Sequence, residues 1–145
     1  MAHSYTSNRV HIVFSTKDRR EQITSDSKLR EYIEDIANNL HVPLFEVGGT
    51  GNHVHILMEV PAFMTLAKVV QTIKANTSRF LKESVPDFAW QEGYGAFSVS
   101  ASGIESVREY IKSQPEHHTK HTFEDEFRSL LVRHGIHFDE KYVFG

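Results

Sequence analysis

The sequence predicts an α+β fold built on one antiparallel sheet. Segments in which every second residue is apolar alternate with longer segments in which apolar residues recur at helical spacing. Their order is strand, helix, strand, strand, helix, strand, followed by two additional C-terminal helices. The first six elements match the ferredoxin-like (βαββαβ) layout, in which two helices cover one side of the sheet. No repeat or linker divides the chain, so we expect a single domain over residues 1–145.

Four short segments have the period-two pattern of a strand. The predicted strands cover residues 8–15, 44–47, 53–59 and 96–100. A glycine-rich stretch, residues 48–52, separates the second strand from the third. These two strands are therefore expected to form a β-hairpin.

Four longer segments have the spacing of amphipathic helices. The predicted helices cover residues 26–40, 64–82, 104–114 and 122–134. Ser25 or Asp26 can cap the first helix, and Pro115 is expected to stop the third. The inward stripe of the last helix consists of Phe123, Phe127, Leu130 and Leu131.

The composition excludes several kinds of site. The chain has no cysteine, which excludes disulfides, thiolate zinc sites and cysteine nucleophiles and fits a cytoplasmic protein. No apolar run approaches the roughly 20 residues of a membrane span, and the first residues lack a secretory signal pattern, so we expect no membrane association. The formal net charge is -3, so any contact with nucleic acid must rest on local patches.

The third predicted strand carries two histidines suited to a metal ion. His53 and His55 are two residues apart and share one face of the strand, while the opposite face is apolar. Imidazole is the commonest metal-binding side chain, and a stiff strand holds two of them with little ordering cost. The alternative is a solvent-facing strand whose histidines have no function.

A tyrosine and a glutamine project together from the third predicted helix. Tyr110 and Gln114 are spaced i,i+4 at the border of its apolar stripe. The alternatives are a structural tyrosine at the edge of a core and a solvated helix end. If these side chains meet the histidine pair, two imidazoles and an amide oxygen supply three ligands and leave positions open, as at a catalytic metal site.

Such a site suits phosphodiester chemistry. A divalent ion polarises the phosphodiester, and a nearby phenol attacks it. Tyrosine is a weak nucleophile because its ordinary pKa is about 10, so the metal or a base must assist. A covalent phosphotyrosine would retain the energy of the broken bond, so a strand can be rejoined without ATP.

These residues resemble the motifs of a known family. The segment His53-Val54-His55 resembles the HUH motif, and residues 107–114 resemble the tyrosine helix of single-tyrosine transposases. Further resemblance lies in residues 11–17, 90–100, 116–118 and 141–144. Together these segments are similar, over nearly the whole chain, to the HUH-superfamily single-tyrosine transposases of the IS200 insertion-sequence type.

The resemblance implies a metal-dependent transposase. Tyr110 would cleave single-stranded DNA at hairpin-bearing element ends, form a 5′-phosphotyrosine and free a 3′-hydroxyl, and the strand would then be rejoined. His53, His55 and Gln114 would hold a magnesium or manganese ion, although two imidazoles suit manganese or zinc better than magnesium. The resemblance also implies a homodimer formed by joining two sheets, in which the tyrosine helix can complete the active site of the other subunit.

Charged and histidine-rich segments outside this group have two interpretations each. The candidates for DNA contact are Arg19, Arg20, Lys68, Arg79 and Lys82. The alternative for each is a solvated loop or helix face. His117 and His121 are at helical spacing and, with His118, can form a second metal site. The alternative is a polar bend between two helices.

Two other functions stay open from the sequence. A domesticated relative would use the same chemistry as a hairpin-specific endonuclease on chromosomal DNA. A non-catalytic single-strand-binding module would stack bases on exposed aromatic residues of the sheet. His53 and His55 occupy the strand face where such aromatic residues would lie.

Overall fold

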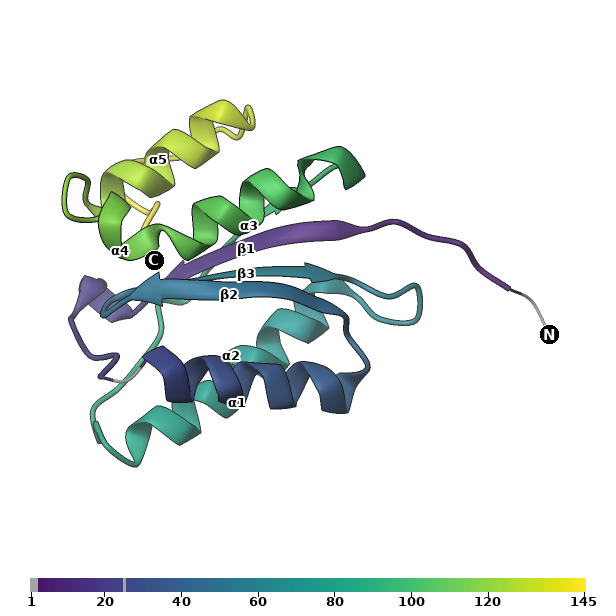
Figure 1. Ribbon diagram of the computed structural model, residues 1–145. Helices are drawn as coiled ribbons and strands as arrows, with labels where there is room; N and C mark the ends of the chain where they lie inside the picture. The colour runs from purple at the N-terminus through teal and green to yellow at the C-terminus, as the bar shows by residue number, and fades with distance from the viewer. Residues whose placement is uncertain (1–2, 25) are drawn as a thin grey trace.

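The structure, a computed structural model, describes residues 3–24 and 26–145 and is centred on a four-stranded antiparallel sheet (Figure 1). The strands are β1 (Arg9–Ser15), β2 (Leu44–Thr50), β3 (His53–Glu59) and β4 (Gly95–Ser98). Their order is β2-β3-β1-β4, and every neighbouring pair is antiparallel. This strand order and the βαββαβ connectivity confirm the predicted ferredoxin-like fold.

Helices cover both faces of the sheet (Figure 1). On one face lie α1 (Asp26–Leu40) and α2 (Leu66–Lys82). On the other face lie α3 (Ile104–Lys112), α4 (Gln114–His117) and α5 (Phe123–Arg133). The two predicted C-terminal helices, which the structure contains as α3, α4 and α5, therefore form a second helical layer. Ser25, one of the two residues predicted to cap α1, lies outside the described residues.

The two faces of the sheet bury different kinds of side chain. The larger core, between the sheet and α1 and α2, is mostly aliphatic and includes Ile12, Ile56 and Val70. The smaller core, under α5, is half aromatic and consists of Val13, Phe97, Phe123, Phe127, Leu130 and Leu131. The histidine-bearing face of β3 belongs to this second layer. The alternative of a solvent-facing histidine strand is therefore wrong.

The strand before the hairpin is longer than expected. β2 continues to Thr50, so the turn consists of Gly51 and Asn52 alone. Gly48 lies inside the strand, where a Cβ atom would be 2.6 Å from the main-chain oxygen of Ile111 in α3. The glycine thus allows close contact between α3 and this edge strand rather than a turn. The hairpin itself agrees with the prediction.

The third predicted helix is divided in two. α3 ends at Lys112, and Ser113 leaves helical geometry with φ −91° and ψ 12°. The prediction that one helix runs to Gln114 and stops before Pro115 is therefore wrong. Pro115 is the second residue of α4, where a backbone N–H has no partner within the helix. Tyr110 and Gln114 consequently lie on two separate helices.

The other boundaries follow the predicted ones to within two residues. The predicted inward stripe of α5, which contains Phe123 and Phe127, is buried in full. Among the helices in the described part of the chain, none combines the length and the apolar character needed to cross a membrane.

Candidate functional site

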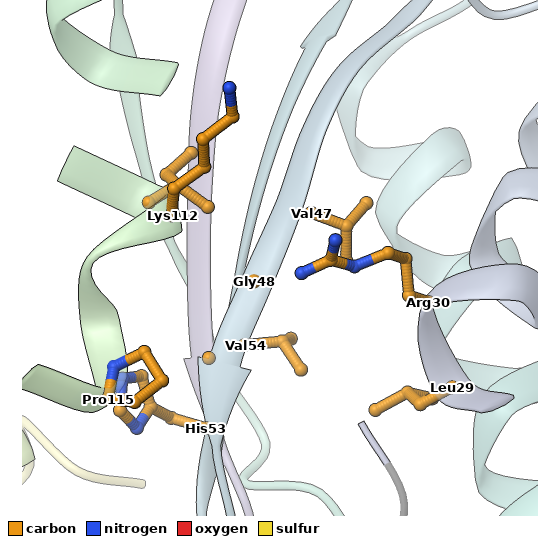
Figure 2. Close-up of a pocket in the computed structure, with 10 residues that line it drawn as sticks. Leu29, Arg30, Val47, Gly48, His53, Val54, Lys112 and Pro115 are labelled. Atoms are coloured by element: carbon orange, nitrogen blue, oxygen red, sulfur yellow. The ribbon is translucent and has the colours of Figure 1, made fainter. Parts of the chain in front are cut away.

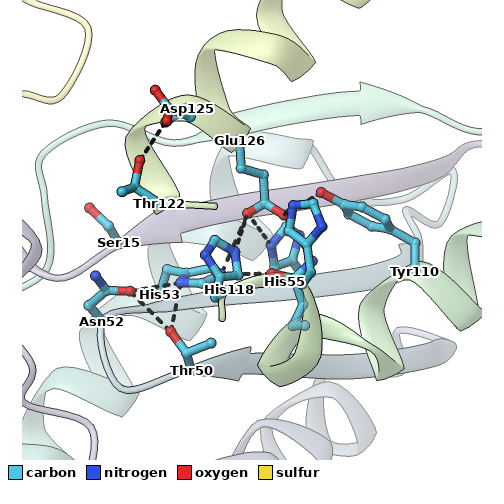
Figure 3. A network of polar contacts seen from close by, with 12 residues as sticks. Ser15, Thr50, Asn52, His53, His55, Tyr110, His118, Thr122, Asp125 and Glu126 are labelled. Atoms are coloured by element: carbon cyan, nitrogen blue, oxygen red, sulfur yellow. Dashed lines mark hydrogen bonds and ion pairs between the residues drawn. The ribbon is translucent and has the colours of Figure 1, made fainter. Parts of the chain in front are cut away.

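The histidines of β3 rise from the interior of the sheet toward the layer formed by α3, α4 and α5 (Figure 3). His55 pairs with Val13 of β1 on one side and with Gly48 of β2 on the other. The side chains of His53 and His55 are fully buried, with 0% exposure. Burial, aided by repulsion from His55, lowers the pKa of His53 to about 3. His53 is therefore neutral near pH 7, as a metal ligand must be.

The hairpin turn fixes the orientation of His53. Its Nδ1 lies 2.8 Å from Asn52 Oδ1 and 3.0 Å from Thr50 Oγ1, and its Nε2 lies 2.9 Å from Gln114 Oε1. A neutral ring has one N–H, and with the proton on Nδ1 the Nε2 lone pair faces Gln114 Oε1. Two lone pairs that face each other are unfavourable as a pair but suit a shared cation. In metal-binding histidines, the ring nitrogen that does not bind the metal usually donates a hydrogen bond to an oxygen acceptor.

His55 is held between β1 and α5. Its Nδ1 shares a 2.7 Å hydrogen bond with His11 Nε2, and its Nε2 lies 3.0 Å from Glu126 Oε1. His11 is itself only 4% exposed, and burial together with His55 lowers its pKa to about 3. The three imidazoles of His11, His53 and His55 thus form a continuous buried group beneath α5.

Glu126 lies at the centre of the polar network (Figure 3). Its Oε1 accepts hydrogen bonds from His55 and from His118, at 3.0 and 3.1 Å. Its Oε2 accepts a hydrogen bond from Gln114 Nε2 at 2.9 Å and another from the hydroxyl of Tyr110. Burial alone raises the pKa of a carboxyl group, but the bonds from His118 and His55 outweigh it and hold the pKa of Glu126 well below its usual range. The cluster therefore contains a buried carboxylate anion, which favours a cation nearby.

Tyr110 is half-buried and reaches the cluster from α3. Burial, and then its hydrogen bond to Glu126, raises the pKa of Tyr110 above its usual value, so the phenol is protonated in this arrangement. A cavity of about 160 Å³ lined by Tyr110, His117 and Arg133 lies on one side of the ring. A second cavity, of about 420 Å³, is lined by Tyr110, His11 and Arg133. The phenol is therefore accessible from outside, although its partners are buried.

A third, smaller cavity lies at the edge of the sheet. It measures about 70 Å³ and lies between α1 and the α3–α4 pair, with Gly48, Val54 and Pro115 on its wall (Figure 2). Ligand pockets usually measure roughly 300–1,000 Å³, so this cavity is too small for a nucleotide. It marks the place where α3 and α4 pack over the edge strand.

The structure brings four of the predicted site residues into one cluster. His53 and His55 come from β3, Gln114 from α4 and Tyr110 from α3, and all four contact Glu126 or one another. The sequence analysis did not include Glu126 or His11 in the site, and it placed His118 only in a second metal site with His117 and His121. A signal for Glu126 was present, because it is three residues after Phe123 and one before Phe127 and therefore lies on the apolar stripe of α5. A lone carboxylate in a buried stripe indicates a polar partner inside the fold.

The predicted DNA-contact residues are mostly distant from this cluster. Lys68, Arg79 and Lys82 are exposed on α2, on the opposite face of the sheet (Figure 1). Arg20 is exposed and pairs with Asp18 and Asp87.

Arg19 alone among these five residues lies beside the cluster. It lines a groove of about 850 Å³ together with Asn52, His118 and Lys120. Other cations that line cavities beside the cluster are Lys120 in a loop and Arg133 on α5.

Comparisons with known proteins identify the family. The sequence profile described as "Transposase IS200 like" matches residues 4–114. The chain belongs to the IS200-like transposase family. Two relatives of this transposase, those for insertion sequence element IS200 of Salmonella typhimurium and Salmonella typhi, are each 25% identical to it over 126 residues, covering 80% of this chain and 82% of theirs.

Two solved structures share the fold of this transposase. A protein from Deinococcus radiodurans, assigned as a transposase, aligns with a TM-score of 0.60 and 21% identity over 79% of this chain and 96% of its own. A REP-associated tyrosine transposase bound to a REP hairpin aligns with a TM-score of 0.61 and 14% identity over 81% of this chain and 73% of its own. The family profile ends at residue 114, so Glu126 and His118 lie beyond the matched range.

Proposed function

We propose that this IS200-like transposase cleaves and rejoins single-stranded DNA at hairpin-bearing ends, with Tyr110 as the nucleophile. In this proposal His53, His55 and Gln114 hold a divalent cation beside the phenol. The observation that carries the proposal is the convergence of one phenol, two buried imidazoles and an amide oxygen in a single cluster. The hairpin substrate rests on the family and on the REP hairpin bound by the structural neighbour.

The reaction is a transfer of the phosphoryl group to tyrosine. The phenol of Tyr110 gives up its proton as its oxygen forms a bond to phosphorus, and the bond from phosphorus to the 3′ oxygen breaks. The departing 3′ oxygen takes up a proton, so the step consumes and releases no net proton. The product is a 5′-phosphotyrosine and a free 3′-hydroxyl. A 3′-hydroxyl that attacks this phosphotyrosine restores a phosphodiester and releases the phenol, so no external energy source is required. A divalent cation, when bound, would stabilise the negative charge on the phosphate oxygens.

The residues around Tyr110 have separate tasks in this reaction. Glu126 accepts a hydrogen bond from the Tyr110 hydroxyl and keeps this hydroxyl protonated, so the contact must be released before the phenol attacks. Arg133 lines both cavities beside the phenol and supplies a positive charge suited to a DNA phosphate. Arg19 and Lys120 line the neighbouring groove and suit the flanking strand. Two imidazole ligands favour manganese over magnesium.

The remaining assembly is also part of the proposal. β2 and β4 form the edges of the sheet, and a homodimer that joins two sheets would pair one of these edges with its copy. We expect the protein to act in the cytoplasm, where bacterial DNA is accessible.

A labelled single strand bearing a hairpin tests the proposal. With manganese, the wild-type protein should form a covalent protein–DNA adduct that survives a denaturing gel. Tyr110→Phe should bind the hairpin but form no adduct, because the ring remains and only the nucleophilic oxygen is lost. Tyr142→Phe, which alters a tyrosine that is 65% exposed, is the matched control and should form the adduct normally.

Two results would contradict the proposal. An adduct of unchanged yield in Tyr110→Phe would remove this residue from the reaction. Tight binding without any adduct, equal in manganese and in chelator, would favour a non-catalytic single-strand-binding module instead. His53→Ala separates the metal requirement from the nucleophile, because it should abolish the stimulation of cleavage by manganese while Tyr110 is still present.

A further inference from the structure

A second histidine pair contacts the buried carboxylate outside the cation site proposed above. His117 ends α4, and His118 follows it directly. The Nε2 atom of His118 lies 3.1 Å from Glu126 Oε1, and that of His117 lies 3.5 Å from Glu126 Oε2. The pair on β3 approaches the same carboxylate from the sheet, through His55 at 3.0 Å and His53 at 3.6 Å.

Each histidine pair forms a potential ligand set with the same carboxylate. His53, His55 and Glu126 offer three ligand atoms that all lie within 4.8 Å of one another. His117, His118 and Glu126 offer a second set that meets the same limit. Glu126 is the one residue common to both sets. We propose that Glu126 bridges two divalent cations, one held by His53, His55 and Gln114 and the other by His117 and His118.

The chemistry of the second set suits a cation. Two imidazole nitrogens and a carboxylate oxygen are ligands that manganese, cobalt and zinc accept. Burial lowers the pKa of His117, which favours the neutral imidazole that a cation requires. Glu126 is 4% exposed, and its buried negative charge favours a cation nearby.

The position of the second set also fits the reaction. His117 is 30% exposed and lines the 160 Å³ cavity that also contains Tyr110 and Arg133, so an ion can reach this side of Glu126 from solvent. The ring centroids of His117 and Tyr110 are 5.6 Å apart. Pairs of cations about 3.5–4 Å apart stabilise both the attacking and the leaving oxygen in phosphoryl transfer. A carboxylate that bridges the two histidine pairs therefore suits the phosphodiester chemistry proposed for Tyr110.

This inference rests on the first cation site of the proposed function, but its test counts cations and needs no DNA. Manganese is titrated into the protein, and the free ion is followed by its electron paramagnetic resonance signal. The wild-type chain should bind two equivalents, and the bound ions should give the spectrum of an exchange-coupled pair. The double variant His117→Ala, His118→Ala should lose one of the two equivalents and the coupling.

Two further variants identify the bridge. Glu126→Gln keeps the shape of the side chain but removes its charge, so it should abolish the exchange-coupled spectrum. His137→Ala, which removes an exposed imidazole at the far end of α5, is the matched control and should still bind two equivalents. Circular dichroism melts of each variant establish that the fold is retained.

The outcomes separate this inference from the proposed function. A single equivalent in the wild-type protein would overturn the bridged pair, and so would two equivalents that persist in the double variant. Two uncoupled ions in the wild-type protein would overturn the bridging role of Glu126. If one cation binds and the hairpin is still cleaved, this inference fails and the proposed function stands. If two coupled cations bind but Tyr110 forms no adduct with hairpin DNA, the proposed function fails and the bridged pair stands.

Discussion

Replacement of Gly48 by alanine tests how the helix that carries Tyr110 is seated on the sheet. A Cβ atom at this position would lie 2.6 Å from the main-chain oxygen of Ile111 and 2.9 Å from its Cγ2 atom. The closest atom belongs to the backbone of α3 and cannot rotate away. To restore a separation of 3.0–3.4 Å, α3 and β2 must move apart by about 0.4–0.8 Å.

The expected change in the free energy of unfolding for Gly48→Ala is the sum of two opposing effects. Alanine reduces the conformational entropy of the unfolded chain, which stabilises a protein by about 0.4–1 kcal/mol where the native backbone tolerates it. Overpacking costs about 1–3 kcal/mol. We therefore expect a net loss of roughly 1–2 kcal/mol and a fall in Tm of roughly 3–8 °C for a domain of this size. Because displacement by about 1 Å can slow a reaction by about 100-fold, cleavage should fall by at least roughly 10-fold as Tyr110 moves with α3.

Thermal melts and the adduct assay measure the two effects separately. Gly93→Ala is the matched control, because a Cβ atom there meets no atom within 4 Å. Gly93→Ala should keep or slightly raise the Tm and leave adduct formation unchanged. If Gly48→Ala gives the same Tm and the same adduct yield as Gly93→Ala, the close contact between α3 and β2 has no role in stability or in the position of the phenol.

Three other changes have expected outcomes. Thr77→Val removes the acceptor of the 2.9 Å hydrogen bond from Trp90 Nε1 and should lower the free energy of unfolding by about 1–3 kcal/mol in urea titrations. In the metal-free protein His11 and His53 have a pKa of about 3 against 6.5 for an unfolded histidine, so the unfolded chain binds up to two more protons in acid. Stability should therefore be fully present above pH 6.5 and fall by roughly 2–4 kcal/mol from pH 7 to pH 5; equal stability at both pH values, measured in chelator, would contradict these burial effects. Arg133→Ala should weaken adduct formation and reduce its salt dependence without changing manganese binding, and an unchanged salt dependence would exclude a phosphate contact.

The fold was predictable because its strands and helices differ in hydrophobic period. Apolar residues alternate around Ile12, which predicts a strand, and recur at helical spacing around Ile33, which predicts a helix. The βαββαβ order of these elements is compatible with only a few sheet topologies. The division of the third helix was not predictable, because proline is compatible with the first turn of a new helix as well as with the end of an old one. The length of β2 was not predictable either, because Gly48 looks like a turn residue in the sequence. In the structure it lies within the strand and contacts α3, which is distant in sequence.

The sequence predicted residues that act together within one local segment, but it did not predict which segments come together in the folded chain. The spacing of His53 and His55 on a strand placed this pair on one face. The spacing of Tyr110 and Gln114 assumed one continuous helix; the structure divides it, and the two side chains meet at Glu126 from separate helices. The sequence did not say that the C-terminal helix covers the histidine face, so the central role of Glu126 was missed. For the same reason Lys68 and its neighbours on α2 were proposed as DNA contacts, because a solvent-facing helix surface does not reveal which side of the sheet it lies on.

The position of α5 over the histidine-bearing face of β3 has a consequence for the folding of the nascent chain. A ribosome releases the chain from its first residue onward, so the sheet with α1 and α2 can assemble while α5 is still being synthesised. Such a nascent chain exposes the imidazoles of His53 and His55 and lacks Glu126 altogether. Fragments from interrupted translation would then contain the sheet and its two histidines but not the carboxylate on which the polar network is centred.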